Sequence, residues 1–234
     1  MSFRPNSKLY RFFAATPLLL LFVLRGARAA EVVDRIVASV NGQIISLSDW
    51  EQEIAFESLR DTRPLTEVSS KQKDEALHHL IDQELLRQQT ARVEAQPASV
   101  QEIDEQLAQI RALYPAASSE EGWQAVLSAH QMTEEELKNH IHAQLDLLRL
   151  VDARLRPTVH VDGRSIESYY RDRFVPQLKK EGAAPPPLEQ VRPKITEILL
   201  QQKIDESLNT WLTSLRASGE ITIADPSSAL PEKQ

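Results

Sequence analysis

Four short motifs of the form Ser/Thr-x-x-Glu, each directly ahead of an apolar stripe, most constrain what this chain can fold into. In such a capping box the hydroxyl oxygen accepts a hydrogen bond from the backbone N–H three residues later, and the glutamate carboxylate accepts one from the first residue. Because the apolar residues that follow recur every three or four positions, each motif predicts the start of an amphipathic helix and the fold class is expected to be mostly α. The motifs are Ser48/Glu51, Ser99/Glu102, Ser118/Glu121 and Thr133/Glu136.

Prolines and apolar stripes set the expected bounds of the helices. A proline inside a helix removes a backbone hydrogen bond, so Pro97, Pro115 and Pro157 indicate breaks. Pro193 falls within the first turn and a half of the last helix, where the missing N–H costs least. The expected helices are 48 to about 59, 68–93, 99 to about 115, a short one opening at 118, 133 to about 157, 165–178, and 188–218 followed by Gly219.

Two β-prone runs around Asn41-Gly42 predict a hairpin over Ile36–Ser46. Both residues of a two-residue type I′ turn need positive φ, which Asn and Gly tolerate. Ile221-Thr222-Ile223 alternates as a strand, and a lone terminal strand has no ladder. We therefore expect Ile221–Ala224 to pair with the hairpin, so that the long helix before it docks on the N-terminal helices. Thr158–Val161 is also short and β-prone.

The pattern predicts one helical domain that the chain leaves and re-enters. The expected organisation is a helical domain at 30–178, a proline-rich linker at 179–187, a helix and strand at 188–224 that return to the same domain, and a polar tail at 225–234. Three consecutive prolines favour polyproline II in the linker.

The first 29 residues have the pattern of a secretory signal peptide. A basic region holding Arg4, Lys8 and Arg11 precedes an apolar run from Phe12 to Leu24, and Ala27-Arg28-Ala29 is an A-x-A cleavage pattern. The run has about 13 residues against the roughly 20 that span a bilayer, so we expect cleavage after Ala29 rather than an uncleaved anchor. No later stretch is apolar enough to span, and the mature chain is expected to be soluble and exported to the periplasm.

Charge and residue types exclude several classes of protein. The first thirty residues hold five basic and no acidic residues, which leaves 22 basic against 34 acidic residues and a formal charge of −12 for the rest. Such a balance argues against a nucleic-acid binder, which needs a basic face. The absence of cysteine excludes disulfides, thiolate metal sites and cysteine nucleophiles.

No catalytic, cofactor-binding or metal-binding residues can be read from the sequence. His140 and His142 diverge on a predicted helix, as do His78 and His79, and with His130 and His160 they are expected to lie at the surface or on helix flanks. Glu102, Asp104, Glu105 and Glu134–Glu136 lie at helix starts, where the helix dipole already explains them. Five aromatic residues are candidates for client binding, but core packing is the favoured interpretation: Trp50, Trp123, Trp211, Tyr169 and Tyr170.

Several segments resemble the SurA-like periplasmic chaperones. The most specific is the opening of the mature chain, Val32-Val33-Asp34-Arg35-Ile36 followed by Val40-Asn41-Gly42, and weaker similarity runs to Ala224. Further matching segments are Ile81–Leu86, Met132–Leu137, Ser165–Tyr170, Pro187–Lys203 and Trp211-Leu212. Members of this family carry parvulin prolyl-isomerase domains of about a hundred residues after the segment matching Tyr169-Tyr170. Here only about fifteen residues separate that segment from Pro187, too few to bury a core.

The resemblance implies a chaperone body that lacks the isomerase module. We expect an ATP-independent periplasmic chaperone that holds unfolded client proteins in apolar grooves between its helices. Outer-membrane proteins are expected among these clients. A prolyl isomerase or an accessory subunit of one is the alternative, and a structural partner in envelope biogenesis is the third interpretation. No cofactor or nucleic acid is expected, and the client-binding surface and oligomeric state stay open.

Overall fold

The computed structural model describes residues 34–224, and this part of the chain is mostly helical, as the capping boxes predict. The signal peptide expected at 1–29 and the polar tail expected at 225–234 lie outside the described residues. The elements are β1 (Ile36–Val40), β2 (Gln43–Ser46), α1 (Leu47–Arg60), α2 (Ser70–Thr90), α3 (Val100–Ala112), α4 (Glu120–Ala129), α5 (Glu134–Leu155), α6 (Gly163–Tyr169), α7 (Val175–Lys180), α8 (Leu188–Ser218) and β3 (Ile221–Ile223), with short 3₁₀ turns at Leu65–Glu67, Pro115–Ser118 and Arg156–Thr158.

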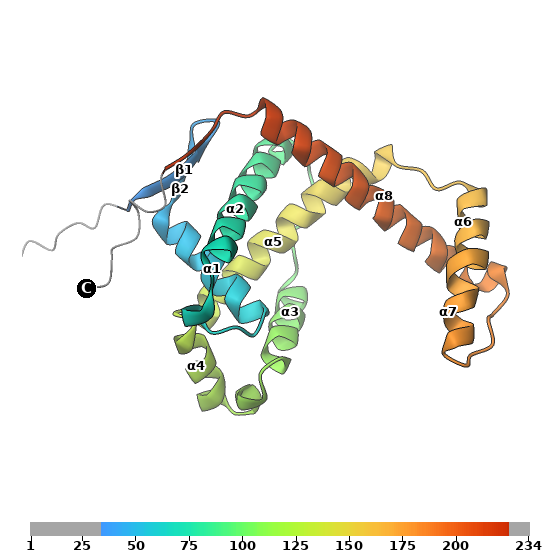
Figure 1. Ribbon diagram of the computed structural model, residues 1–234, viewed down its shortest axis with the longest axis horizontal. Helices are drawn as coiled ribbons and strands as arrows, with labels where there is room; N and C mark the ends of the chain where they lie inside the picture. The colour runs from blue at the N-terminus through green and yellow to red at the C-terminus, as the bar shows by residue number, and fades with distance from the viewer. Residues whose placement is uncertain (1–33, 225–234) are drawn as a thin grey trace, which may run out of the picture. The chain divides into compact units, whose positions relative to one another are not determined.

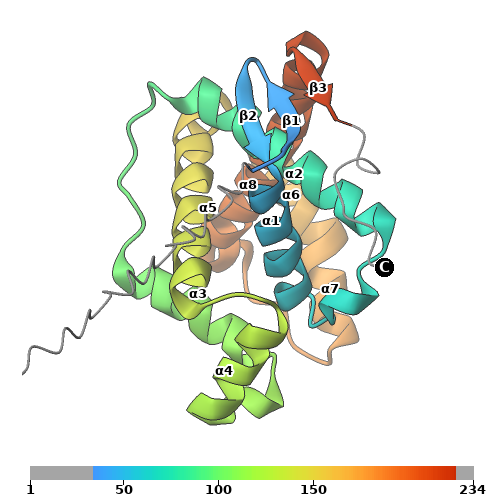
Figure 2. The same ribbon diagram turned by 90° about the vertical axis from the view of Figure 1, so that its left-hand side faces the viewer.

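Both ends of the described chain meet in one small sheet. Its strand order is β2-β1-β3, with β1 antiparallel to both neighbours (Figure 2). Asn41 and Gly42 have φ of 51° and 84°, as the predicted hairpin turn requires. β3 pairs Ala38 with Ile223 and Val40 with Ile221. The predicted closure of the chain on the hairpin is confirmed.

Two of the four predicted helix starts are correct. Ser99 and Thr133 are the N-caps of α3 and α5, and each forms a complete capping box with the glutamate three residues later. A further box opens α2, where Ser69 pairs with Gln72, although the sequence pattern singled out only boxes closed by glutamate.

The other two predicted helix starts are displaced. α1 begins at Leu47 because Ser46 is its N-cap and Asp49 closes the box, so the prediction of Ser48 with Glu51 was wrong. The cause is that β2 runs through to Ser46, where the chain turns directly into the helix. α4 is capped by Ser119, whose hydroxyl accepts from the Gly122 N–H, because Ser118 still belongs to a 3₁₀ turn.

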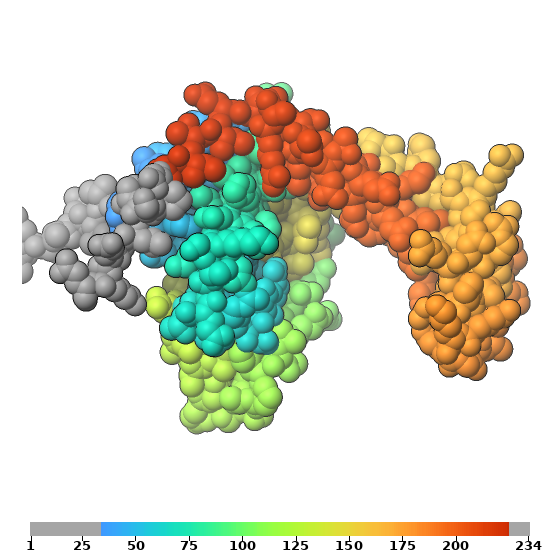
Figure 3. All heavy atoms as spheres, viewed as in Figure 1, coloured from blue at the N-terminus to red at the C-terminus, as the bar shows by residue number. Residues whose placement is uncertain are grey.

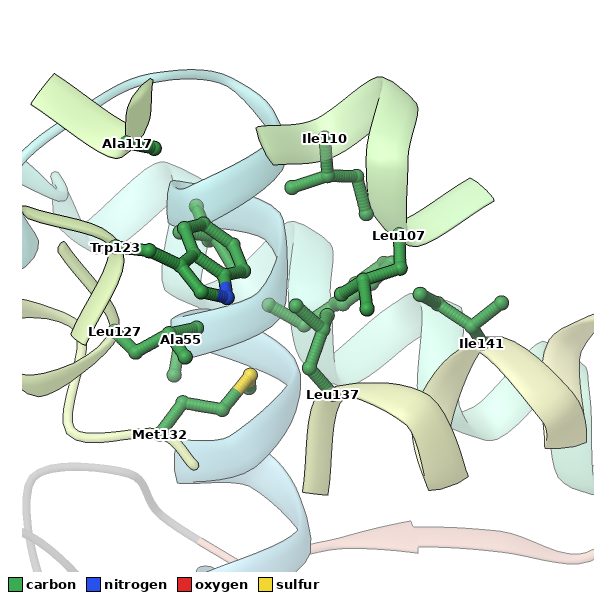
Figure 4. Packing of buried hydrophobic residues seen from close by; sticks show 11 residues of the cluster. Ala55, Leu107, Ile110, Ala117, Trp123, Leu127, Met132, Leu137 and Ile141 are labelled. Atoms are coloured by element: carbon green, nitrogen blue, oxygen red, sulfur yellow. The ribbon is translucent and has the colours of Figure 1, made fainter. Parts of the chain in front are cut away.

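Three apolar clusters fill the interior. The first lies between the sheet, α1 and α2, and the third joins α2 and α5 to α8. The second joins α1, α3, α4 and α5 around Trp123, which is fully buried (Figure 4). Burial of side chains of this size contributes about 1.5–3 kcal/mol each, so these clusters fix how the helices pack. The second cluster consists of Ala55, Phe56, Leu59, Leu107, Ile110, Ala117, Trp123, Leu127, Met132, Leu137 and Ile141.

The long helix α8 crosses α2 and α5, as predicted for a helix that returns to the N-terminal helices (Figure 1). A bidentate pair between Arg216 and Asp82 joins α8 to α2, with 2.6 Å from Nε to Oδ1. At its other end, α8 packs against α6 (Figure 3). Pro193 lies inside the second turn of α8 without ending the helix.

The segment from Gly163 to Lys180 is helical throughout, with a π-helical stretch at Tyr170–Phe174 between α6 and α7. This agrees with the single helix predicted over 165–178, although it begins two residues earlier. The β-prone segment Thr158–Val161 does not form a strand: Thr158 ends the 3₁₀ turn at Arg156–Thr158, and the described sheet consists of β1, β2 and β3.

Candidate functional site

A groove of about 490 Å³ runs along one side of α1, and we call it the α1 groove. Its other walls come from the 3₁₀ turn at Leu65–Glu67, the start of α2, the turn between α4 and α5, and the first turns of α5. It is lined by Ser48, Glu51, Gln52, Ile54, Ala55, Leu65, Lys73, Gln131, Met132, Glu136 and His140.

The α1 groove combines an apolar floor with a polar rim. Ile54, Ala55 and Met132 also belong to the buried core, so core packing fixes the positions of these side chains in the groove. The rim carries the carboxylates of Glu51 and Glu136 against a single ammonium group, that of Lys73. Such a surface can take an apolar side chain of an extended polypeptide while its backbone amides meet polar groups.

A buried ionisable pair lies beneath this groove. Glu53 on α1 is only 2% exposed, and its Oε2 lies 3.3 Å from Nε2 of His140 on α5. These two atoms are buried and neither has a hydrogen-bond partner among the described residues, so the close approach is not an aligned hydrogen bond. The His140 ring also stacks on Phe56, with 4.0 Å between ring centroids.

Burial shifts both groups towards their neutral forms. It raises the pKa of Glu53 to about 7, and repulsion from the Glu57 carboxylate adds to the rise. It lowers the pKa of His140 to about 4, with a smaller contribution from the Arg60 guanidinium. His140 is therefore neutral at pH 7, and Glu53 holds its proton to a higher pH than an exposed glutamate does.

The structure places two of the five candidate aromatic residues in the core. Trp50 and Trp123 are at most 1% exposed, and their indole N–H groups donate to the Lys73 carbonyl at 2.7 Å and to Glu134 Oε2 at 2.8 Å. For these two the predicted core packing is confirmed. Trp211 is half-buried under the Arg154 guanidinium, 4.6 Å from the ring centroid.

Tyr169 and Tyr170 are half-buried where α6 meets the π-helical stretch. The Tyr170 hydroxyl donates to the Pro186 carbonyl at 2.7 Å, and its ring stacks on Phe174. The tyrosine thus holds the end of the predicted linker against α6. None of the five aromatic residues lines the α1 groove.

The histidines only partly follow the prediction that they lie at the surface or on helix flanks. His78, His142 and His160 are exposed, as predicted. His130 is buried, because it caps the end of α4 and its ring nitrogens lie 2.8 Å from the Val126 carbonyl and 3.1 Å from the Arg63 carbonyl. His140 is turned inwards onto Glu53, so for these two residues the prediction was wrong.

Two of the carboxylates at helix starts, those of Glu102 and Glu136, close the predicted capping boxes. Glu102 accepts from the hydroxyl and the backbone N–H of Ser99, which with Arg149 lowers its pKa to about 2. Thr133 in the same way lowers the pKa of Glu136. Asp104 and Glu105 lie in the first turns of α3, and Asp104 lies 3.5 Å from Lys138 Nζ.

Sequence reasoning missed the Glu53–His140 pair because its members are 87 positions apart. One signal was nevertheless present in the sequence. Trp50, Glu53, Ile54 and Glu57 follow the three- and four-residue spacing of a core-facing stripe, so two glutamates occupy positions where apolar residues are expected. A charge at such a position indicates a buried ionisable group.

Comparison with models of protein families places the chain among known proteins. The model of the SurA-like N-terminal domain matches residues 2–151, close to two thirds of the chain, while no curated protein matches it. The match ends within α5, and α8 and β3 complete the same sheet and core. None of the described helices combines the length and apolar character that a membrane span requires. The chain therefore belongs to the family of SurA-like N-terminal domains.

Proposed function

We propose that the protein is an ATP-independent periplasmic chaperone that holds unfolded polypeptides, outer-membrane proteins among them, in the α1 groove. Membership of the SurA-like family supports this class of activity. The observation that carries the proposal is the groove itself, with Ile54, Ala55, Leu65 and Met132 on its floor. Reversible apolar contact of this kind needs neither nucleotide nor a fixed client sequence.

The rim of the groove and the surface charge favour basic clients. Two carboxylates and one ammonium group line the groove, and the chain as a whole carries a formal charge of −7. Attraction between exposed charges weakens as salt shortens the Debye length, to about 8 Å at physiological ionic strength. We expect clients rich in lysine and arginine to bind more tightly at low salt.

The proposal does not include prolyl-isomerase activity. Between Tyr170 and Pro187 the chain forms only the π-helical stretch, α7 and a short loop. Catalysis of isomerisation needs a preorganised pocket that stabilises the twisted amide. We expect an X-Pro peptide to isomerise in the presence of this protein at its uncatalysed rate, over tens to hundreds of seconds. Acceleration that persists in independently purified preparations would favour the isomerase instead.

The test of the chaperone proposal is suppression of client aggregation, with one variant in the groove and one outside it. The purified protein should keep a diluted, urea-unfolded outer-membrane protein soluble at near-stoichiometric ratios without nucleotide. Leu65→Glu places a charge on the groove floor and should weaken client affinity about tenfold, the equivalent of losing one apolar contact. Leu113→Glu is the control, because Leu113 is 49% exposed and does not line the groove.

Circular dichroism melting must accompany both variants, because Leu65 also packs against the core. Equal loss of suppression in the two folded variants would contradict the assignment to the α1 groove. Failure of the unmodified protein to suppress aggregation would contradict the function.

A further inference from the structure

Glu53, Glu57 and His79 bring three potential metal ligands together on the side of α1 that faces α2. One ligand atom from each side chain lies within 4.8 Å of the other two, and among the described residues no other group of three such side chains meets this condition. Glu53 and Glu57 are four residues apart on α1 and so share one face of the helix. His79 comes from α2, and its Nδ1 is in contact with Glu57 Oε1.

We propose that these three side chains bind one divalent transition-metal ion, for which Zn²⁺ is the probe. Two carboxylates and an imidazole are ligands that zinc accepts, and three protein ligands leave a fourth position for water. Ligand atoms around tetrahedral zinc lie roughly 3.4 Å apart, given bond lengths of about 2.0–2.2 Å.

The carboxylate of Glu53 is buried and only weakly hydrogen-bonded. The side chain is 2% exposed, its Oε1 accepts one long hydrogen bond from Gln83 Nε2 at 3.4 Å, and its Oε2 has no hydrogen-bond partner. An ion bound through one oxygen would keep Glu53 ionised, and the other oxygen could accept a hydrogen bond from His140 Nε2–H, now 3.3 Å away. Hydrogen bonding to ligating carboxylates is a regular feature of metal sites.

The ion would also relieve an electrostatic conflict on α1. Glu53 and Glu57 repel each other, and a divalent cation between them compensates both charges. His79 and, to a smaller extent, the Arg60 guanidinium oppose the effect of Glu57 on Glu53.

A cavity next to Glu57 and His79 gives the ion and its water a route to the proposed site. Glu57 and His79 line a cavity of about 130 Å³ on this side of α1. The same cavity is lined by the carboxylates of Asp61 and Glu75 and by the guanidinium groups of Arg60 and Arg63. The imidazole of His79 is about half exposed, so one ligand is reached directly from solvent.

The competing explanation is a proton. A protonated Glu53 can direct its O–H at neutral His140 Nε2 and so satisfy both atoms without any ion. The two explanations differ in what they require of His79 and Glu57. The ion needs both side chains, whereas the proton needs neither.

Isothermal titration calorimetry of the full, tag-free protein with zinc chloride distinguishes them. We expect one zinc ion per chain and at least a tenfold loss of affinity in His79→Gln and in Glu57→Gln. His78→Gln is the matched control, because this neighbouring histidine is also exposed but directs its Nδ1 at the Asp74 carbonyl, and it should keep the affinity of the unmodified protein. His79 is exposed enough that its substitution should not threaten the fold.

Side-chain NMR of the histidines gives a second measurement. Zinc should shift the Nδ1 resonance of His79 and leave His78 unchanged. Absence of saturable binding, or a stoichiometric site that both His79→Gln and Glu57→Gln retain, would overturn the proposal and leave the proton as the explanation of the Glu53–His140 pair.

Discussion

Removal of the last strand tests whether the ends of the chain hold the fold together. Truncation after Gly219 deletes β3, its three residue pairs with β1, and three hydrogen bonds to the hairpin that flank these pairs. The Asn41 N–H donates to the Glu220 carbonyl and the Glu220 N–H to Asn41 Oδ1, both at 2.8 Å, while the Ala224 N–H donates to the Val37 carbonyl at 2.9 Å. Ile221 also packs against the first apolar cluster.

The expected cost follows from these contacts. The three flanking hydrogen bonds at about 1 kcal/mol net each, and about 1 kcal/mol for the partly buried Ile221, give about 4 kcal/mol, to which the ladder between β1 and β3 adds. For a chain of this length 1 kcal/mol shifts the melting temperature by about 2–4 °C, so we expect a drop of at least roughly 8 °C. The measurement is thermal unfolding followed by circular dichroism at 222 nm.

Truncation after Ala224 is the control, because it removes residues 225–234 and keeps the strand. Its melting temperature should equal that of the full chain. If the truncation after Gly219 also melted within about 2 °C of the full chain, β3 would contribute nothing to the sheet, and the argument that the strand closes the fold would be refuted.

Two further predictions concern buried groups. Trp123→Ala should lower the free energy of unfolding in urea by about 3–5 kcal/mol, and Trp211→Ala, a half-buried residue, should cost clearly less; equal costs would contradict the assignment of Trp123 to the core. In metal-free buffer, the raised pKa of Glu53, about 7, makes the free energy of unfolding fall as pH rises from about 4.5 to 7. The lowered pKa of His140, about 4, makes it rise as pH rises from about 4 to 6.5. The two effects therefore offset each other between about pH 4.5 and 6.5. The variant Glu53→Gln removes only the effect of Glu53. Across this pH window its free energy of unfolding should rise relative to that of the unmodified protein by up to about 1.4 kcal/mol per pH unit. Parallel pH profiles of the two proteins would contradict this prediction.

Local rules predicted most of the architecture because they act over a few residues. Asn41-Gly42 dictates a tight turn wherever it lies between β-prone runs, and the predicted hairpin is found. The apolar stripe of the last helix is long and ends at Gly219, and the predicted bounds of this helix, 188–218, are correct. The pairing of β3 was predictable because an apolar terminal strand needs a partner and the hairpin was the available one.

The failures arise where a neighbouring element decides between two local choices. Ser46 and Ser48 are both suitable N-caps, and only the length of β2 selects Ser46. Thr158–Val161 has the composition of a strand, but a strand also needs an edge to pair with, which a local pattern does not encode. Burial of His130 depends on the Arg63 carbonyl, 67 positions away, so no spacing rule could find it.

The candidate site could not be predicted from the sequence, because the packing of helices creates it. The α1 groove takes its walls from four separate stretches of chain, and no motif marks them. The absence of a metal site was predicted from histidine spacing within single helices, a rule that does not consider ligands from different helices. That prediction still stands untested, and the zinc titration decides it.

Glu53 is the position where local and global requirements disagree most, and the disagreement bears on function. Glu53 Oε2 is a buried acceptor without a hydrogen-bond partner, which costs about 1–3 kcal/mol, whereas an apolar side chain at this core-facing position would contribute stability. Stability therefore does not explain the residue. Its carboxylate lies against His140, a wall residue of the α1 groove, and next to Glu57 and His79 on the opposite side of the same helix. Conflicts of this kind concentrate at functional sites, and both the client groove and the metal site that we propose lie on α1.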